Sequence, residues 1–163
     1  MTATTLTQRT SLFLRRFPWL FTIAHAFWRL FQAKYSVGAV GVVFNEEDKV
    51  LLAKHAFHPK YPWALPGGWV DRNEDPAITV CREMLEELML DVEVYSILLV
   101  ETPYKNHLDL AYLCRALNEV GKLSYELLDY GWFGLDELPP MLDVHHRAIE
   151  KAILVKQTME TEA

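Results

Sequence analysis

Residues 67–90 read GGWVDRNEDPAITVCREMLEELML, and this stretch decides the fold that the rest of the chain must build. Asp75 is a good helix N-cap, and Pro76 suits the first helical position, where its missing N–H would be unpaired anyway. At 100° per residue, three carboxylates fall within a sector of roughly 100°, those of Glu83, Glu86 and Glu87. The opposite side is apolar, and we expect the core to bury its four residues, Ile78, Cys81, Leu85 and Leu88.

The three glutamates have two interpretations. Most acidic helix faces are simply solvated, which is the ordinary reading of such a cluster. However, like charges three and four residues apart destabilise a helix by a few tenths of a kcal/mol per pair, and only Arg82 lies near enough to offset them. A hard divalent cation such as Mg²⁺ would supply the missing charge, because it prefers carboxylate oxygens and retains waters and substrate phosphates as its other ligands.

The wider pattern favours the second interpretation. The stretch resembles the Nudix box, Gly-x5-Glu-x7-Arg-Glu-U-x-Glu-Glu-x-Gly-U, in which U is a bulky aliphatic residue. The family positions are occupied by Gly68, Glu74, Arg82, Glu83, Met84 (accepted as U), Glu86, Glu87 and Leu90. Two later segments add to the resemblance: Trp63 begins a W-x-L-P-G-G approach to the box, and residues 132–139 match a W-F-x-x-(D/E)-E-L-P ending.

The chain departs from the box at Met89, where the family has its second glycine. That position ends the helix and often requires a left-handed residue, so methionine there costs roughly 1–2 kcal/mol if it adopts this conformation. Asn73 stands where relatives often have glycine. Asparagine also tolerates the left-handed region, so we expect the turn to survive.

The resemblance implies an α/β fold, a Nudix-like α/β/α sandwich with a mixed β-sheet. It also implies hydrolysis of a diphosphate linkage in a nucleoside diphosphate joined to another moiety, such as a nucleotide sugar, a dinucleotide or an NTP. On this basis Mg²⁺ or Mn²⁺ is held by Glu83, Glu86 and Glu87. The expected catalytic residues are Glu86, Glu87, Arg82 and Glu126, with Asp109 a weaker choice of base. The expected substrate-binding residues are Gly67, Gly68, His55 and Lys60.

Two alternatives stay open beside this enzymatic hypothesis. One is a catalytically silent Nudix-like sensor that binds a nucleotide. The other is a membrane-associated hydrolase of a lipid-linked diphosphate, recruited by the N-terminal segment.

Composition predicts one folded domain with an extension. The chain has 163 residues, of which 51% are hydrophobic, and we divide it into a helical extension over 1–34 and a hydrolase domain over 35–163. Residues 1–35 carry +5 and no acid, which leaves −11 on the remainder of a chain whose net charge is −6, so nucleic acid is not an expected partner. Cys81 and Cys114 lie in apolar settings and are expected to be core thiols, which fits a cytoplasmic location.

The segment 11–34, SLFLRRFPWLFTIAHAFWRLFQAK, predicts an amphipathic helix with a wide apolar face. Pro18 starts a helix or kinks a longer one, and a polar stripe follows at Thr22, His25, Arg29 and Gln32. The uncharged run 17–28 is too short to span a bilayer. A signal peptide matches poorly, whereas a mitochondrial transit peptide stays open. Three other surfaces could cover the apolar face of this helix. They are the domain itself, a second copy in a homodimer, or a membrane surface contacted peripherally through residues 11–34.

The remaining pattern predicts strands and one closing helix. Strands are expected at 37–44, 50–53, 92–102, 107–115, 123–128 and 130–133, the first two joined as a hairpin. The closing helix is expected over 143–160, with Ile149, Ile153 and Leu154 facing inward. His145 and His146 fall in its first turn and are expected on the surface.

Overall fold

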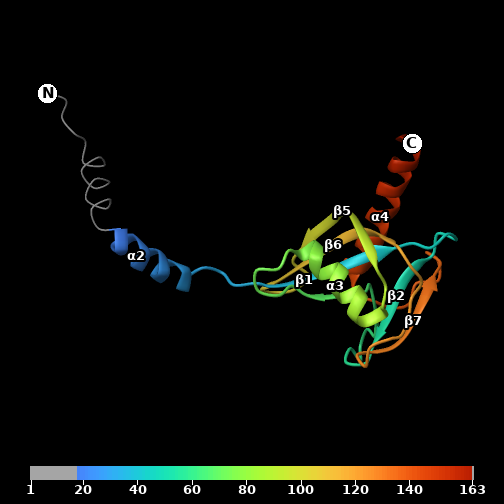
Figure 1. Cartoon of the computed structure of the whole chain (residues 1–163), viewed down its shortest axis with the longest axis horizontal. Helices are drawn as coiled ribbons and strands as arrows, with labels where there is room; N and C mark the ends of the chain where they lie inside the picture. Colours follow the sequence, from blue (N-terminus) through green and yellow to red (C-terminus); the bar gives the residue numbers. More distant parts are fainter. Residues whose placement is uncertain (1–17, 163) are drawn as a thin grey trace. The chain divides into compact units, whose positions relative to one another are not determined.

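A computed structural model describes residues 18–162, which form two units that divide between Lys34 and Tyr35. The elements in chain order are α2 (Pro18–Leu30), β1 (Ser36–Val43), β2 (Val50–His55), β3 (Trp63–Ala64), β4 (Gly67–Trp69), α3 (Pro76–Leu88), β5 (Val92–Glu101), β6 (His107–Ala116), β7 (Leu127–Phe133) and α4 (Asp143–Glu162) (Figure 1).

The larger unit contains two sheets. One has the strand order β4-β1-β6-β5, in which β1 and β6 run parallel while β4 and β5 pair antiparallel with their neighbours. The other has the order β3-β2-β7 and is antiparallel throughout. The expected hairpin is therefore only partly correct. β1 and β2 meet at a single bridge between Phe44 and Val50 and then separate into different sheets.

Helices α3 and α4 cover opposite faces of this assembly and define two cores (Figure 1). Residues of α3 pack with Ala39, Val43 and Leu51 in one core. Residues of α4 pack with Val42, Leu52 and Leu113 in the other. Alternate residues of β1 point to alternate cores, as a doubly covered strand requires. The α/β/α arrangement with a mixed sheet is thus confirmed.

The buried face of α3 differs from the expected one. Val80, Met84 and Leu88 are fully buried, whereas Ile78 and Leu85 are 58% and 49% exposed. The apolar arc of this helix is wider than the core it meets. The buried residues lie along the edge of this arc that adjoins the glutamates. Glu87 is therefore turned toward the core, and the opposite edge of the arc faces outward.

Three other expectations are also corrected. The segment 123–128 is not a strand of its own, because β7 is continuous from Leu127 to Phe133 and shifts register against β2 between the pairs Asp129–Lys54 and Leu127–His55. In α4, Leu154 is 63% exposed while Ile149 is buried as expected and Val155 packs on the core instead. His145 is buried, at 7% exposure, because α4 begins against the segment between β3 and β4, which leads into the glycine pair.

The end of α3 accommodates the unusual methionine. Met89 adopts φ 49° and ψ 36°, the left-handed conformation that glycine usually fills. Its N–H donates to the Leu85 carbonyl, which is the bond of an αL cap, and the Leu90 N–H donates to the Met84 carbonyl. The helix therefore ends as the resemblance implies, with the strain borne by Met89.

The smaller unit is described only by α2. Pro18 is its first residue, and residues 11–17 of the expected segment lie outside the described residues. His25 stacks between two aromatic rings of its own helix, Phe21 and Trp28, at centroid distances of 6.1 and 5.7 Å. No helix among residues 18–162 is long and apolar enough to cross a membrane.

Candidate active site

The glycine pair forms the floor of the candidate site. Gly67 and Gly68 in β4 lie antiparallel to Val40 and Ala39 in β1. Gly67 has φ 146°, and a Cβ there would lie 2.2 Å from the Ala39 carbonyl oxygen. A Cβ on Gly68 would lie 2.4 Å from the carboxyl carbon of Glu83. The Glu83 carboxylate can therefore rest against bare backbone only because this position has no side chain.

The turn before α3 is built as the sequence predicts. Asn73 takes φ 65°, and the Asp75 carboxylate accepts a hydrogen bond of 2.9 Å from the Ala77 N–H as the N-cap. Glu74, between them, accepts from the Thr79 hydroxyl at 2.7 Å and from the Asp71 N–H at 3.2 Å. These contacts fix the position of the Glu74 carboxylate relative to the first turn of the helix.

Arg82 links this turn to the glutamates of α3. Its guanidinium donates from Nε and Nη2 to the two oxygens of Glu74, at 2.9 and 3.0 Å, which is a bidentate pair. Nη1 donates to Glu83 at 2.8 Å and to Glu86 at 3.4 Å. The hydrogen bonds from Arg82 lower the pKa of Glu74 to about 2, so this carboxylate stays ionised. Through these hydrogen bonds Arg82 holds the glutamates in position, and it does not itself line the cleft.

Glu87 is the most unusual carboxylate in the site. It is 6% exposed, and its Oε2 is buried with no hydrogen-bond partner. Burial raises its pKa to about 8, and the charges of Glu83, Glu126 and Glu86 add to the effect. Burial also raises the pKa of Glu83, against the opposing effect of Arg82. A buried acceptor without a donor is costly, and a nearby cation would relieve that cost.

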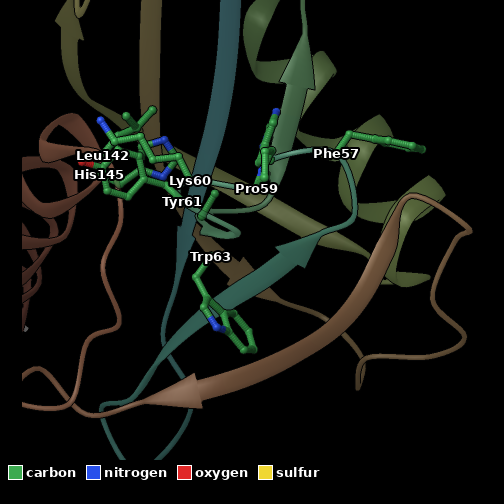
Figure 2. Close-up of a pocket in the computed structure, with 9 residues that line it drawn as sticks. Phe57, Pro59, Lys60, Tyr61, Trp63, Leu142 and His145 are labelled. Carbon is green, nitrogen blue, oxygen red and sulfur yellow. The ribbon is translucent and has the colours of Figure 1, made fainter.

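A cleft of about 460 Å³ brings most of the expected site residues together. Its lining includes seven of them, Gly67, Gly68, Glu83, Glu86, Glu87, His55 and Glu126. Lys60 is separate, because it lines a neighbouring pocket (Figure 2). Asp109, the weaker choice of base, also lines the cleft. The lining residues that were not expected in the site include Trp69, Tyr104, His107 and His145.

His107 anchors one end of the cleft. Its Nε2 lies 2.7 Å from Asp109 Oδ1, and its Nδ1 lies 2.8 Å from the Ser36 hydroxyl. Tyr104 stacks on the imidazole at 4.5 Å and 8°, and Trp69 meets it edge-on at 5.0 Å. Apart from Asp109, sequence reasoning missed this corner because its residues come from three strands and a loop and carry no shared motif.

Two histidines at the other end are held neutral. His145 Nδ1 accepts a hydrogen bond of 2.9 Å from the Leu65 N–H, two residues before the glycine pair. Burial lowers the pKa of His145 to about 4, and nearby His55, His146 and His58 lower it further. Burial likewise lowers the pKa of His55 to about 4. His55 therefore offers a hydrogen bond rather than a positive charge to an anionic ligand at neutral pH.

The donor set fits a hard divalent cation in its chemistry. Carboxylate oxygens are the ligands that Mg²⁺ and Mn²⁺ prefer, and the unpartnered Glu87 oxygen lies in the wall that Glu83 and Glu86 share. Within residues 18–162, no three His, Cys, Asp or Glu side chains already converge on one point as a metal site would require. Arg82 holds Glu83 and Glu86 in the positions described.

Comparison with known proteins gives the family context. A protein-family model described as the NUDIX domain matches residues 34–153. The Xenopus laevis protein called nucleoside diphosphate-linked moiety X motif 6 is 33% identical over 120 residues, which cover 65% of this chain and 53% of that protein. An NAD-capped RNA hydrolase, NudC, from Pectobacterium carotovorum is 29% identical over 119 residues, covering 70% and 46%. The matched part thus spans about half the length of these relatives.

Solved structures share the fold. An ADP-ribose pyrophosphatase from Streptococcus suis superposes with a TM-score of 0.64 at 28% identity, covering 78% of this chain and 94% of its own. A UDP-X diphosphatase superposes with a TM-score of 0.66 at 18% identity, covering 98% and 86%. The second likeness concerns the fold alone.

Proposed function

The chain belongs to the NUDIX family, and on that premise we propose that it hydrolyses a diphosphate linkage in a nucleoside diphosphate joined to another moiety, with Mg²⁺ or Mn²⁺ as cofactor. One observation carries the proposal: the unpartnered, buried Oε2 of Glu87, set in a cleft that it shares with Glu83, Glu86 and Glu126. A purely structural glutamate would be expected to have its buried oxygen hydrogen-bonded.

Glu83, Glu86 and Glu87 are the residues that would hold the cation. When bound, the cation neutralises diphosphate oxygens and lowers the pKa of the attacking water. Glu83 and Glu86 already share the Nη1 donor of Arg82, so their carboxylates are kept on one side of α3 before any ligand arrives. Preorganised charge of this kind contributes strongly to catalysis, because it costs no reorganisation during the reaction.

Arg82 acts in this mechanism as a positioning residue. Its bidentate pair with Glu74 ties it to the turn before α3, while Nη1 remains directed at Glu83 and Glu86. The glycine floor has a complementary role. Without side chains at positions 67 and 68, backbone can approach the phosphates closely.

Glu126 is our candidate for the base that accepts a proton from the attacking water. It is exposed at the cleft, and its charge acts on Glu83, Glu87 and His55, which lie around it. A carboxylate with this exposure can exchange its proton with solvent after each turnover. The Glu126→Gln variant should therefore lose kcat while retaining Mn²⁺ binding, whereas Glu87→Gln should lose both.

The direct test is a substrate panel of nucleotide sugars, dinucleotides and nucleoside triphosphates, assayed with Mg²⁺, with Mn²⁺ and with EDTA. The proposal expects release of a nucleoside monophosphate or an equivalent phosphate product from some member of the panel, abolished by EDTA. It is refuted if the folded protein binds a member tightly and releases no product under any of these conditions. That result would instead identify a silent nucleotide sensor.

The helical extension supports a second proposal, which is contact with an anionic membrane surface. Six large apolar side chains of α2 are each more than half exposed: Trp19, Phe21, Ile23, Phe27, Trp28 and Leu30. Residues 1–35 contain five basic residues and no acid, a charge that complements anionic headgroups. For a protein recruited to such a surface, a lipid-linked diphosphate would be a further candidate substrate.

Sedimentation with vesicles tests the extension. The full chain should co-sediment with phosphatidylcholine vesicles that contain phosphatidylglycerol and should do so less with phosphatidylcholine alone. The Trp19→Ser/Phe27→Ser double variant should lose sedimentation while keeping hydrolytic activity. The full chain could instead stay in the supernatant and form a dimer that this double variant dissociates. In that case the apolar face of α2 packs against a second copy of the chain, and the membrane proposal is wrong.

A further inference from the structure

A second pocket, of about 320 Å³, adjoins the carboxylate cleft (Figure 2). The loop between β2 and β3 supplies most of its wall, and β3 and the start of α4 supply the rest. Apolar and aromatic side chains dominate the lining, and among residues 18–162 Lys60 is the one lysine or arginine in it. The residues that shape it most are Phe57, Lys60, Tyr61, Trp63, Leu142 and His145.

The second pocket is continuous with the cleft. Five residues line both, namely Phe57, His58, Ala64, Leu142 and His145. In Figure 2, Leu142 and His145 at the start of α4 lie beside Lys60 and Tyr61, and Phe57 lies on the other side of the loop. A ligand in the cleft can therefore extend into this pocket without crossing a wall of backbone.

The opposite end of the cleft is also aromatic. Trp69 and Tyr104 both contact the His107 ring, and they are 59% and 53% exposed. The imidazole beneath them is held by Asp109 and by Ser36, so the corner has a fixed base. Its two rings present apolar surface to the cleft beside the phosphate-binding floor.

The carboxylates lie between these two ends. Trp69 follows Gly68 directly, and Gly68 contacts the Glu83 carboxylate. On the other side, the charge of Glu126 acts on both Glu87 and His55, and His55 packs against His58 with ring centroids 5.1 Å apart. The order along the cleft is thus aromatic corner, glutamates, histidines and aromatic pocket.

Packing in the two hydrophobic cores does not account for the exposed aromatic rings that line the cavities. Phe57 is 70% exposed, yet it lines both cavities, and Trp69 and Tyr104 belong to neither core cluster. Aromatic rings in such positions can stack on a planar ligand. Stacking of this kind is favourable for every nucleobase. A sugar would instead need several hydrogen-bonding partners, whereas the lining surface of the second pocket is mostly apolar and the Nδ1 of His145 is already bonded to Leu65.

We propose that the substrate carries a planar aromatic group on each side of its diphosphate, as two nucleosides joined through a diphosphate do. One base lies in the pocket of Phe57 and Tyr61, and the other lies in the corner of Trp69 and Tyr104. This inference rests on the proposed hydrolase function and selects among its substrates. It favours a dinucleotide over a nucleotide sugar or a nucleoside triphosphate.

The test compares diadenosine diphosphate with ADP-ribose, which share one adenosine diphosphate and differ in the second moiety. Phe57→Ala and Trp69→Ala each remove one exposed ring from one end. Both variants should raise KM for diadenosine diphosphate by at least about fivefold, the value expected for one lost stacking contact. Only one of them should raise KM for ADP-ribose, because that molecule has a single base. Tyr95→Ala, which removes an exposed ring from β5 outside both cavities, should leave both KM values unchanged.

Calorimetry with Mn²⁺ in a Glu126→Gln background separates this inference from the hydrolase proposal, because this background should keep the cation and not turn the ligand over. Diadenosine diphosphate should bind more tightly than ADP-ribose, and each ring deletion should weaken its binding, even if no hydrolysis occurs in any assay. The inference is overturned if the two ligands bind equally, or if either deletion leaves both the binding and the KM of diadenosine diphosphate unchanged. Circular dichroism melts of both variants verify that the fold is retained.

Discussion

The Glu83 carboxylate occupies the space that a side chain at Gly68 would fill, with 2.4 Å between the Glu83 carboxyl carbon and a Cβ built on Gly68. The obstructing atoms belong to the flexible end of a glutamate and not to backbone. The fold can therefore accept alanine at position 68, provided that Glu83 moves away. Position 67 differs, because a Cβ there meets the Ala39 carbonyl oxygen at 2.2 Å.

The two glycine positions should consequently separate activity from stability. Gly68→Ala should lower kcat by about 10²-fold, because a displacement of a catalytic group by about 1 Å has effects of that size. Its Tm should change little. Gly67→Ala should lower the free energy of unfolding by roughly 2 kcal/mol or more, since the backbone conformation and the contact are both unfavourable. Thermal melts with parallel kinetics measure this, and equal Tm losses in both variants would contradict the assignment.

Met89 offers a stabilising substitution. Its left-handed conformation is strained for a residue with a Cβ, so Met89→Gly should raise the free energy of unfolding by about 1 kcal/mol. Met89→Ala is the matched control, because it removes the same side chain and keeps the strained Cβ. Urea denaturation should show a higher free energy of unfolding for the glycine variant than for the alanine variant. If alanine matches glycine at this position, the strain assigned to Met89 is absent.

The sequence predicted the parts of the site that depend on local chemistry. The N-cap at Asp75, the left-handed Asn73 and the closeness of Arg82 to the glutamates all follow from short-range rules about turns and helix spacing. The strand limits at β5 and β6 followed from their apolar runs. These features need no knowledge of which elements meet in space.

Features set by tertiary packing were not predictable in the same way. The apolar arc of α3 fits two rotations of the helix, and only the position of the strands decides that Met84 is buried while Leu85 is not. His145 looked like a surface residue because its partner, the Leu65 N–H, is 80 residues away. The corner at His107 depends on β1 and β6 lying parallel side by side, which no local signal reports.

The buried histidines make stability depend on pH. His145 takes up its proton near pH 6.5 when unfolded but only near pH 4 when folded, so the unfolded state binds more protons between these values. The free energy of unfolding should therefore fall as pH drops from about 6.5 to 4, with about 3 kcal/mol attributable to His145. Chemical denaturation across this range measures the slope.

Two variants identify the group responsible. His145→Asn should remove much of the slope, because asparagine can still accept from Leu65 and has no proton to gain. His146→Asn, at the neighbouring position, should leave most of the slope in place, because burial is the main cause of the lowered pKa of His145. A slope that survives in His145→Asn would assign the pH dependence to His55, whose pKa is also lowered to about 4.

The ionisable carboxylate of Glu87 should lower the free energy of unfolding of the metal-free protein at high pH. Its raised pKa means that the folded state holds a proton that the unfolded state has released, so ionisation at high pH weakens the fold. In EDTA at pH 9, Glu87→Gln should be more stable than the parent by about 1–3 kcal/mol, since the amide has no charge to bury. The parent should melt at lower temperature as pH rises from 5 to 9, and the variant should lose this trend. A destabilised variant would mean that the carboxylate is satisfied in the metal-free fold.

Titration with Mn²⁺ tests the central claim most directly, because it measures the cation at the glutamates without requiring a known substrate. The full chain should bind Mn²⁺ with a measurable heat, Glu87→Gln should lose that heat, and Glu46→Gln, an exposed glutamate away from the cleft, should retain it. If the parent chain binds no Mn²⁺, or if Glu87→Gln binds it as well as the parent does, then these carboxylates do not hold a cation and the hydrolase assignment for this chain fails.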